Sequence, residues 1–266
     1  EYWPLERAKL ISKKRKKFEG NIAIITGGAG KIGSAIAKKF LTENIEVVLF
    51  DKNFKPLNNE IKNKCTCIKC DLSKKEEVSK SINKVVSQFG GIDILISNSG
   101  SAFQGQMKDL DENILQNSMA NNFYSHHYII QKTINIMINQ SFGGSISINL
   151  SKQSINPGNN FGPYGIAKAS ALFMMKQYAL ECGKYNIRVN GINADRIQSG
   201  LLTKKMIGQR AKARGVKEED YLKNNLLNKE VTAADVAESF YVQLCLDKTT
   251  ANIITVDGGN IEASLR

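Results

Sequence analysis

The chain has 266 residues, of which 42% are hydrophobic and 23% are charged, so it is suited to one well-filled globular domain or two small ones. This composition excludes disorder for most of the chain. No apolar run approaches the roughly 20 residues that a membrane-spanning helix needs, and the N-terminus lacks the apolar stretch of a secretory signal, so we expect a soluble protein with no membrane partner.

The formal net charge is +12, and its densest part lies at the start of the chain. Residues 1–20 carry seven basic and three acidic side chains, including the basic run at residues 13–17. This predicts a basic N-terminal extension or linker over residues 1–20 and one domain over residues 21–266. Nucleic-acid binding is the alternative, but no zinc-finger spacing, aromatic RNA-binding signature or basic leucine zipper accompanies the run, so we expect no nucleic-acid partner.

Short apolar runs then alternate with segments of helical length along the whole chain. Strands that are apolar almost throughout indicate a parallel sheet covered on both faces by right-handed crossovers. We therefore predict an α/β fold, a single doubly wound Rossmann domain with a seven-stranded parallel sheet. The polar, Lys-rich stretch at residues 196–230 is predicted to be a mobile lid. The predicted strands are residues 21–25, 45–50, 65–70, 92–97, 145–150, 187–192 and 253–256.

A glycine-rich turn follows the first predicted strand and opens the first predicted helix. It spans residues 26–33 with the sequence Thr-Gly-Gly-Ala-Gly-Lys-Ile-Gly. The glycines let the backbone approach a pyrophosphate, and the helix N-terminus then faces the anion. Glycines also serve any tight turn, so the turn favours a dinucleotide site through its position between strand and helix.

Asp51 ends the second strand 18 residues after the last glycine of the turn. A carboxylate there accepts hydrogen bonds from both hydroxyls of an adenosine ribose and repels a 2′-phosphate, which predicts NAD rather than NADP, although Lys52 lies beside it. Asp71-Leu72 and the sequence at residues 98–100, Asn-Ser-Gly, close the third and fourth strands, where ligands of open parallel sheets bind. Loops or helix caps are the alternative reading of each.

The five cysteines are an odd number in a chain too long to need disulfide staples, which predicts a reducing, cytoplasmic setting. Cys67 and Cys70 form a CxxC just after Cys65, but no fourth ligand is near, so we expect no metal. The only histidines, His126 and His127, are interpreted as ordinary helix residues, with substrate contact as the alternative.

Tyr164 and Lys168 are four residues apart in a segment rich in helix formers, so their side chains leave one face of a helix. A neighbouring ammonium lowers the pKa of a phenol from its usual value near 10, as does an oxidised nicotinamide, which makes the phenol a usable base. Ser151 lies at the end of the fifth strand, 13 residues before Tyr164.

Taken in order, these motifs resemble the short-chain dehydrogenase/reductase family over residues 20–260. The resemblance implies that Tyr164 is the general base or acid, that Lys168 orients the ribose and lowers the tyrosine pKa, and that Ser151 hydrogen-bonds the reacting oxygen. Asn122 matches the asparagine that holds a water in the proton relay, with Asn121 as the adjacent rival. The implied cofactor residues are Thr26, Gly27, Gly30, Lys31, Ile32, Gly33, Asp51, Asp71, Leu72, Asn98, Gly100, Tyr164, Lys168 and Ala194.

Two positions depart from the family pattern. The common Thr-Gly-x-x-x-Gly-x-Gly has glycine where Lys31 stands, and this variant is more usual in the extended branch of the superfamily. Ala194 and Asp195 replace the Pro-Gly that commonly follows the sixth strand, at the contacts to the nicotinamide carboxamide. Residues 256–259, Val-Asp-Gly-Gly, resemble the usual ending of the last strand.

A closer resemblance rests on residues 1–6, 151–162 and 224–232, which look like the dehydrogenase half of the bifunctional aldolase/short-chain dehydrogenases of the rhamnulose-phosphate aldolase/lactaldehyde dehydrogenase type. It implies a role in carbohydrate metabolism, a hydroxyaldehyde substrate such as lactaldehyde, and an aldolase domain covalently linked in the full-length protein. The runner-up is a sugar-phosphate dehydrogenase such as sorbitol-6-phosphate 2-dehydrogenase, since basic residues in the stretch at residues 196–230 suit a phosphate.

The resulting hypothesis is an NAD-dependent oxidoreductase that transfers a hydride between the cofactor and the CH–OH or C=O group of a small hydroxylated substrate. A non-catalytic nucleotide-binding regulatory module is the alternative from another class, because fold alone does not determine function. Association into a homodimer or homotetramer is expected through the helix that carries Tyr164. Its small residues allow close helix packing, either against a partner or within the monomer: Ala167, Ala169, Ser170 and Ala171.

Overall fold

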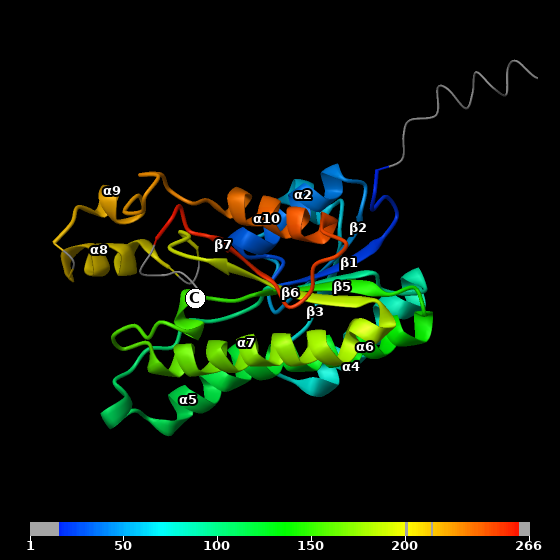
Figure 1. Cartoon of the computed structure of the whole chain (residues 1–266), viewed down its shortest axis with the longest axis horizontal. Coiled ribbons are helices and arrows are strands. Elements are labelled where there is room, and N and C mark those ends of the chain that lie inside the picture. Colours follow the sequence, from blue (N-terminus) through cyan, green and yellow to red (C-terminus); the bar gives the residue numbers. More distant parts are fainter. Residues whose placement is uncertain (1–15, 200–201, 214, 261–266) are drawn as a thin grey trace, which may run out of the picture.

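The computed structural model describes residues 16–199, 202–213 and 215–260. Most of the predicted N-terminal extension, residues 1–15, lies outside the described residues. From residue 21 onward the described chain folds as one α/β domain with helices on both faces of a central sheet (Figure 1). None of the helices within the described ranges is long and apolar enough to cross a membrane.

The sheet confirms the predicted fold class. All seven strands are parallel, in the order β3-β2-β1-β4-β5-β6-β7. The observed strands lie within two residues of the predicted bounds, because apolar side chains cover both faces of a sheet that is buried on both sides. They are β1 (Ile22–Thr26), β2 (Glu46–Asp51), β3 (Thr66–Lys69), β4 (Ile94–Ser97), β5 (Gly144–Asn149), β6 (Ile187–Ala194) and β7 (Ile253–Val256).

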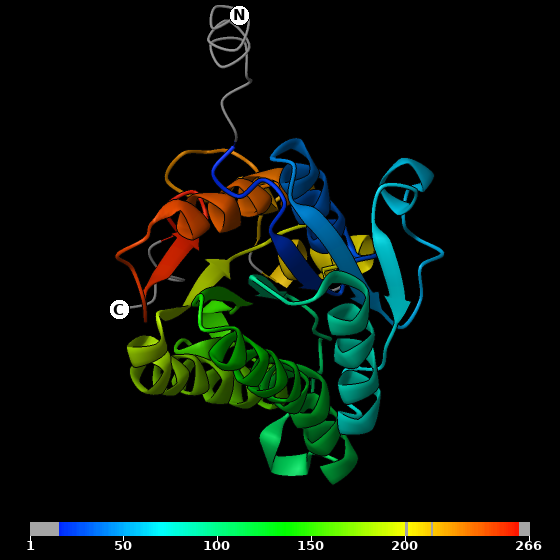
Figure 2. The same cartoon turned by 90° about the vertical axis from the view of Figure 1, so that its right-hand side faces the viewer.

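Helices pack on the sheet in two layers. One layer, α2 and α10, covers one face, and α4, α6 and α7 cover the other, as two perpendicular views show (Figures 1 and 2). The α-helices are α2 (Lys31–Thr42), α3 (Asn59–Lys62), α4 (Lys75–Phe89), α5 (Glu112–Met119), α6 (Ser125–Gln140), α7 (Gly162–Cys182), α8 (Lys204–Ala213), α9 (Glu218–Tyr221) and α10 (Ala233–Cys245).

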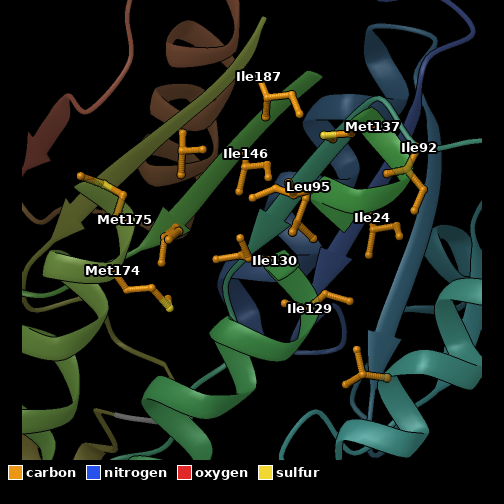
Figure 3. Packing of buried hydrophobic residues seen from close by; sticks show 14 of the residues in the cluster. Ile24, Ile92, Leu95, Ile129, Ile130, Met137, Ile146, Met174, Met175 and Ile187 are labelled. Carbon is orange, nitrogen blue, oxygen red and sulfur yellow. The ribbon is translucent and has the colours of Figure 1, made fainter. Parts of the chain in front are cut away.

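Each face of the sheet has its own hydrophobic core. Ile24, Leu95 and Ile146 project from neighbouring strands toward Ile130 of α6 and Met175 of α7 (Figure 3). The opposite faces of the same strands pack against α2 and α10. This double burial makes the strands rigid, so the loops at their carboxyl ends hold side chains in defined places.

Local signals explain where several helices begin and end. Thr232 and Asp235 form a reciprocal capping box at the start of α10. Pro163 lies in the first turn of α7, where its missing N–H costs no helical hydrogen bond. Gly90 closes α4 with a φ of +83°.

The stretch predicted as a lid contains α8 and α9 and has a small hydrophobic core of its own. The buried members of this core are Leu202, two residues before α8, Ile207 and Ala211 of α8, and Tyr221 of α9. This stretch lies beside the carboxyl ends of the strands. Its mobility stays a prediction.

Candidate active site

The glycine-rich turn between β1 and α2 brings backbone close to a cavity. Gly27 has a φ of +64°, a conformation that glycine adopts without strain. A Cβ on Gly33 would lie 2.2 Å from the carbonyl oxygen of Gly27, and a Cβ on Gly27 would lie 3.0 Å from the Cα of Ser99. The turn therefore packs against itself and against the loop after β4 too tightly for side chains at these two positions.

The cavity has a volume of about 490 Å³ and lies beyond the carboxyl ends of β1, β2 and β4. Since β1 is flanked by β2 and β4, this is the point where the strand order reverses, which is where ligands bind in open α/β sheets. Nine of the predicted cofactor residues line it, and they include the lysine that stands where the family pattern has glycine. The nine are Gly27, Gly30, Lys31, Ile32, Gly33, Asp51, Leu72, Asn98 and Gly100.

Three other predicted cofactor residues lie behind or beside the cavity wall. Thr26 is fully buried, and its hydroxyl accepts hydrogen bonds from two backbone N–H groups of the loop after β4, at 2.8 and 3.1 Å. Asp71 pairs with the Lys52 ammonium at 3.0 Å. Burial raises the pKa of the Asp71 carboxyl, but hydrogen bonds from Ser73 and Lys52 outweigh it and the pKa is lowered. Ala194 ends β6, outside the cavity lining.

Asp51 faces the glycine-rich turn. Its Oδ2 accepts a hydrogen bond from the backbone N–H of Ala29 at 3.0 Å, and its Oδ1 accepts one from the N–H of Asn53 at 3.1 Å. Because the neighbouring Lys52 is paired with Asp71, a second carboxylate stands next to this end of the cavity.

Ser151, Tyr164 and Lys168 come together as predicted. Tyr164 shares a side-chain hydrogen bond with Ser151, and the Lys168 Nζ lies 5.8 Å from the centre of the Tyr164 ring. Lys168 is 3% exposed and donates to the carbonyl oxygen of Asn149, a cavity-lining residue, at 2.8 Å. A Cβ on Gly100, in the cavity wall, would lie 3.8 Å from the same ammonium. Lys168 therefore lies against the inner wall of the cavity, and none of the three side chains is among the described residues that line it.

The expectation that Tyr164 has a lowered pKa is wrong for the protein alone. Burial raises the pKa of the Tyr164 phenol to about 12, although the hydrogen bond with Ser151 opposes this. Burial also lowers the pKa of Lys168 to about 7, so its charge is only partly present at neutral pH. Desolvation is therefore the dominant cause of both pKa shifts, and the hydrogen bond with Ser151 opposes it only at Tyr164.

Sequence reasoning missed one member of this cluster. His126, in the first turn of α6, is fully buried, and its Nε2 lies 3.3 Å from the Lys168 Nζ while its Nδ1 lies 2.7 Å from the Ser97 hydroxyl. The histidine was interpreted as an ordinary helix residue. A lone histidine inside a helical pattern carries no sequence signal for such a contact.

The two candidate asparagines occupy different environments in a π-helical turn, Ala120–Tyr124. Asn122 is fully buried, accepts a hydrogen bond from the Ser101 N–H at 2.9 Å and donates to the Ser101 carbonyl at 2.9 Å. Asn121 lines the cavity and donates to the carbonyl of Asn117. Asn122 thus braces the loop after β4, and Asn121 faces the ligand space.

Asp195, which stands in place of a glycine, forms a buried ion pair that the sequence did not indicate. Its carboxylate lies 3.2 Å from the Lys152 Nζ and accepts a hydrogen bond from Asn260 at 2.8 Å. Lys152 directly follows Ser151. The pair therefore ties the end of β6 to the loop that carries Ser151.

Comparison with known proteins gives the class of protein. A family model described as "Enoyl-(Acyl carrier protein) reductase" matches residues 27–260. The uncharacterised oxidoreductase YuxG of Bacillus subtilis is 31% identical over 97% of this chain, which spans 40% of YuxG. The 7alpha-hydroxysteroid dehydrogenase of Escherichia coli is 27% identical over 95% of this chain and 99% of its own length. The chain belongs to the short-chain dehydrogenase/reductase family and is related to oxidoreductases.

A solved structure supports the fold. An NAD⁺-bound xylitol dehydrogenase superposes with a TM-score of 0.84 at 23% identity, covering 92% of this chain and all of the other. Members of the family bind a nicotinamide cofactor, and the site here has the right form for one: a turn that a single Cβ would fill, a cavity beside it, and a carboxylate at its ribose end. No comparison supports the aldolase/dehydrogenase type specifically.

Proposed function

We propose that the chain is an NAD-dependent dehydrogenase that interconverts a CH–OH group and a C=O group in a small hydroxylated substrate. One observation carries the proposal. Tyr164 shares a side-chain hydrogen bond with Ser151, the centre of its ring lies 5.8 Å from the Lys168 Nζ, and Lys168 lies against the wall of a cavity lined by the glycine-rich turn. An acid–base group beside a nucleotide cavity is the arrangement that alcohol oxidation requires.

In oxidation, the Ser151 hydroxyl donates a hydrogen bond to the substrate oxygen and holds it against Tyr164. Tyr164 takes the hydroxyl proton, the C–H bond breaks and the carbonyl forms, so that one hydride and one proton leave the substrate. The bound NAD supplies the acceptor for that hydride. Reduction is the same sequence in reverse, with Tyr164 donating the proton.

Lys168 supplies positive charge near the phenol. Because burial raises the Tyr164 pKa to about 12, a nearby cation is needed before the phenol can act as a base at neutral pH. The ammonium is already directed at the cavity wall by its hydrogen bond to the Asn149 carbonyl. Asn122 is proposed to support the proton relay through the loop that it braces.

The preference for NAD is supported by Asp51 and by the pairing of Lys52 with Asp71. A 2′-phosphate would approach two carboxylates without a free lysine between them. Asp51→Ala should therefore lose affinity for NAD and lower the NAD-to-NADP preference by about tenfold or more. An unchanged preference would refute the role of this carboxylate.

The decisive experiment is a screen of absorbance at 340 nm with NAD and NADP against short hydroxyaldehydes, polyols and their phosphates. Hydroxyaldehydes such as lactaldehyde are the first candidates, since the sequence resembles that type. Reduction of NAD by any of them, lost in Tyr164→Phe, supports the proposal. Absence of turnover with every alcohol and carbonyl, together with intact NADH binding, would favour the nucleotide-binding regulatory module.

A sugar-phosphate substrate is the second candidate, and one observation favours it. The Arg210 guanidinium of α8 lies 4.6 Å above the ring of Phe161, which in turn packs edge-on against Tyr164 at 6.2 Å. A cation so close to the acid–base group suits a phosphate or carboxylate on the substrate. Arg210→Leu should raise KM for a phosphorylated polyol and leave KM for the unphosphorylated one unchanged.

We also propose that the chain pairs with itself through α7. Ile166, Phe173 and Leu180, spaced by seven residues on this helix, are 43%, 71% and 79% exposed. Two of the small residues expected to face a partner, Ala167 and Ala171, are instead buried within the monomer. Sedimentation should show a homodimer or homotetramer, and Phe173→Glu should shift it toward the 29.4 kDa monomer.

Two further proposals concern the protein as a whole. A covalently linked aldolase domain rests on the sequence resemblance alone. The mass of the native protein tests it. A cytoplasmic setting is supported by the five cysteines, all free thiols in the structure, and cell fractionation tests it.

A further inference from the structure

His126 is a buried titratable group that the proposed reaction does not use. It lies on α6, between Ser97 of β4 and Lys168 of α7, so it links three separate elements. All three side chains are at most 3% exposed. A histidine with one polar partner on each ring nitrogen needs one nitrogen to donate and the other to accept, unless the ring is charged.

The surroundings select the neutral ring. Burial lowers the pKa of His126 well below its ordinary value, and the Lys168 charge lowers it further. An ammonium only donates, so Nε2 must accept from Lys168, and the ring proton must then lie on Nδ1 and be donated to the Ser97 hydroxyl. The Lys168 ammonium therefore determines the tautomer of His126, and the Ser97 hydroxyl, which can donate or accept, accommodates it.

We propose that His126 is a positioning residue for Lys168, holding the ammonium so that its remaining N–H points into the nucleotide cavity. The ammonium has three donors. One goes to the Asn149 carbonyl at 2.8 Å and one to the His126 Nε2 at 3.3 Å. The third is free to face the side on which Gly100 forms the wall of the cavity.

The inference rests on the proposed function in one respect, since Lys168 matters there because it assists Tyr164. Among the described residues, the titratable side chains in contact with Lys168 are Tyr164 on its own helix and His126 on α6. Ser97 of β4 and the Asn149 carbonyl of β5 contribute dipoles without charge. Removal of His126 therefore removes the one titratable acceptor that another element offers this ammonium.

The first test measures which ring nitrogen of His126 carries the proton, and it needs neither cofactor nor substrate. The chain has two histidines, so ¹⁵N spectra of the imidazoles from pH 5 to 8 are assigned with the His127→Asn variant. We expect His126 to carry its proton on Nδ1 and to remain neutral across this range. In Lys168→Met, which removes the ammonium, the proton should move in part to Nε2. A proton on Nε2 in the wild type, or a charged ring at pH 7, would overturn the proposal.

The second test separates positioning from packing by comparing three variants. His126→Leu removes the acceptor, His126→Gln offers an amide oxygen where Nε2 stands, and His127→Leu is the matched control on the same helix. We expect His126→Leu to move the acid limb of the kcat/KM profile for alcohol oxidation upward by about one pH unit, which is about tenfold in rate at pH 7. His126→Gln should restore most of that shift.

The direction follows from the hydrogen bond. Loss of an acceptor lowers the pKa of Lys168 further below about 7, so less ammonium remains to support the Tyr164 phenolate at neutral pH. An unmoved pH profile in His126→Leu, or equal losses in the Leu and Gln variants, would overturn the proposal. Should His126→Leu not fold, Ser97→Ala takes its place with a smaller shift of the same sign. If the wild type oxidises no alcohol, the proposed function fails while the imidazole spectra still decide the role of His126.

Discussion

The two ends of the candidate site are built in different ways. The nucleotide end consists mainly of backbone within residues 26–33, where the absence of side chains creates the space. The chemical end consists of side chains from β4, α6 and α7, with Ser97 and Lys168 separated by 71 residues, and burial determines their ionisation. The first end therefore depends on local shape, and the second on long-range packing and electrostatics.

This contrast predicts two kinds of sensitivity. Adding a single methyl group should damage the nucleotide end, because close-packed backbone cannot move aside cheaply. At the chemical end, changes that preserve volume but remove a proton, a charge or an acceptor should be the damaging ones. The predictions below test this difference.

The largest effect is expected from Tyr164→Phe, which keeps the ring and removes the hydroxyl. Turnover should fall by about 10²–10⁴-fold, the usual contribution of a general acid–base group, while NADH binding measured by fluorescence titration stays near normal. Tyr185→Phe, at a 41% exposed position, is the control. A Phe variant with near-normal turnover would contradict the assignment.

The next effect is expected from Gly33→Ala at the nucleotide end. Its Cβ would lie 2.2 Å from the Gly27 carbonyl oxygen, so α2 must shift, and we expect a loss of about 2–3 kcal/mol in unfolding free energy together with weaker NADH binding. Gly183→Ala is the matched control, since nothing lies within 4 Å of its Cβ. Equal stability of the two variants in urea would show that the turn is looser than described.

Lys152→Met tests the buried ion pair beneath the Ser151 loop. Asp195 would keep only the Arg196 guanidinium, whose Nε lies 3.5 Å away, and the Asn260 amide, so we expect a cost of about 2 kcal/mol, below the usual range for a buried pair. Lys108→Met is the control, because its pair with Asp109 is more than 70% exposed on both sides and should change stability by less than about 0.5 kcal/mol. Similar losses in both variants would contradict a structural role for the pair.

The effect that is smallest per pH unit is a pH dependence at the chemical end. Lys168 has a pKa of about 7 in the folded chain against an ordinary value near 10.5, so between these values the unfolded chain binds more protons and unfolding free energy rises with pH. We expect a contribution of up to about 1 kcal/mol per pH unit above pH 7, and none below it, where both states are protonated.

Lys168→Met should abolish that contribution, whereas Lys176→Met, at an exposed position on the same helix, should retain it. Urea unfolding from pH 6.5 to 9.5 measures the difference. Identical slopes in the wild type and Lys168→Met would show that the ammonium is better solvated than its burial indicates.

Local sequence patterns were enough to predict the seven parallel strands and to place the glycine-rich turn and Asp51 at strand ends, and they led us to expect Ser151, Tyr164 and Lys168 close together. These features depend on local patterns: apolar runs, a strand–turn–helix order, and a four-residue helical spacing. Local patterns can be recognised in a sequence because hydrogen bonding and side-chain direction repeat at regular intervals along the chain.

The environment of those groups depends on tertiary packing and was not predictable from local patterns. It brought Ser97 and His126 to Lys168, buried Asn122 while leaving Asn121 at the cavity, and paired Lys152 with Asp195. It also reversed the expected direction of the Tyr164 pKa, because desolvation outweighs a neighbouring charge. Such effects depend on which distant residues share a buried volume, and that is settled by strand order and helix packing, not by any spacing in the sequence.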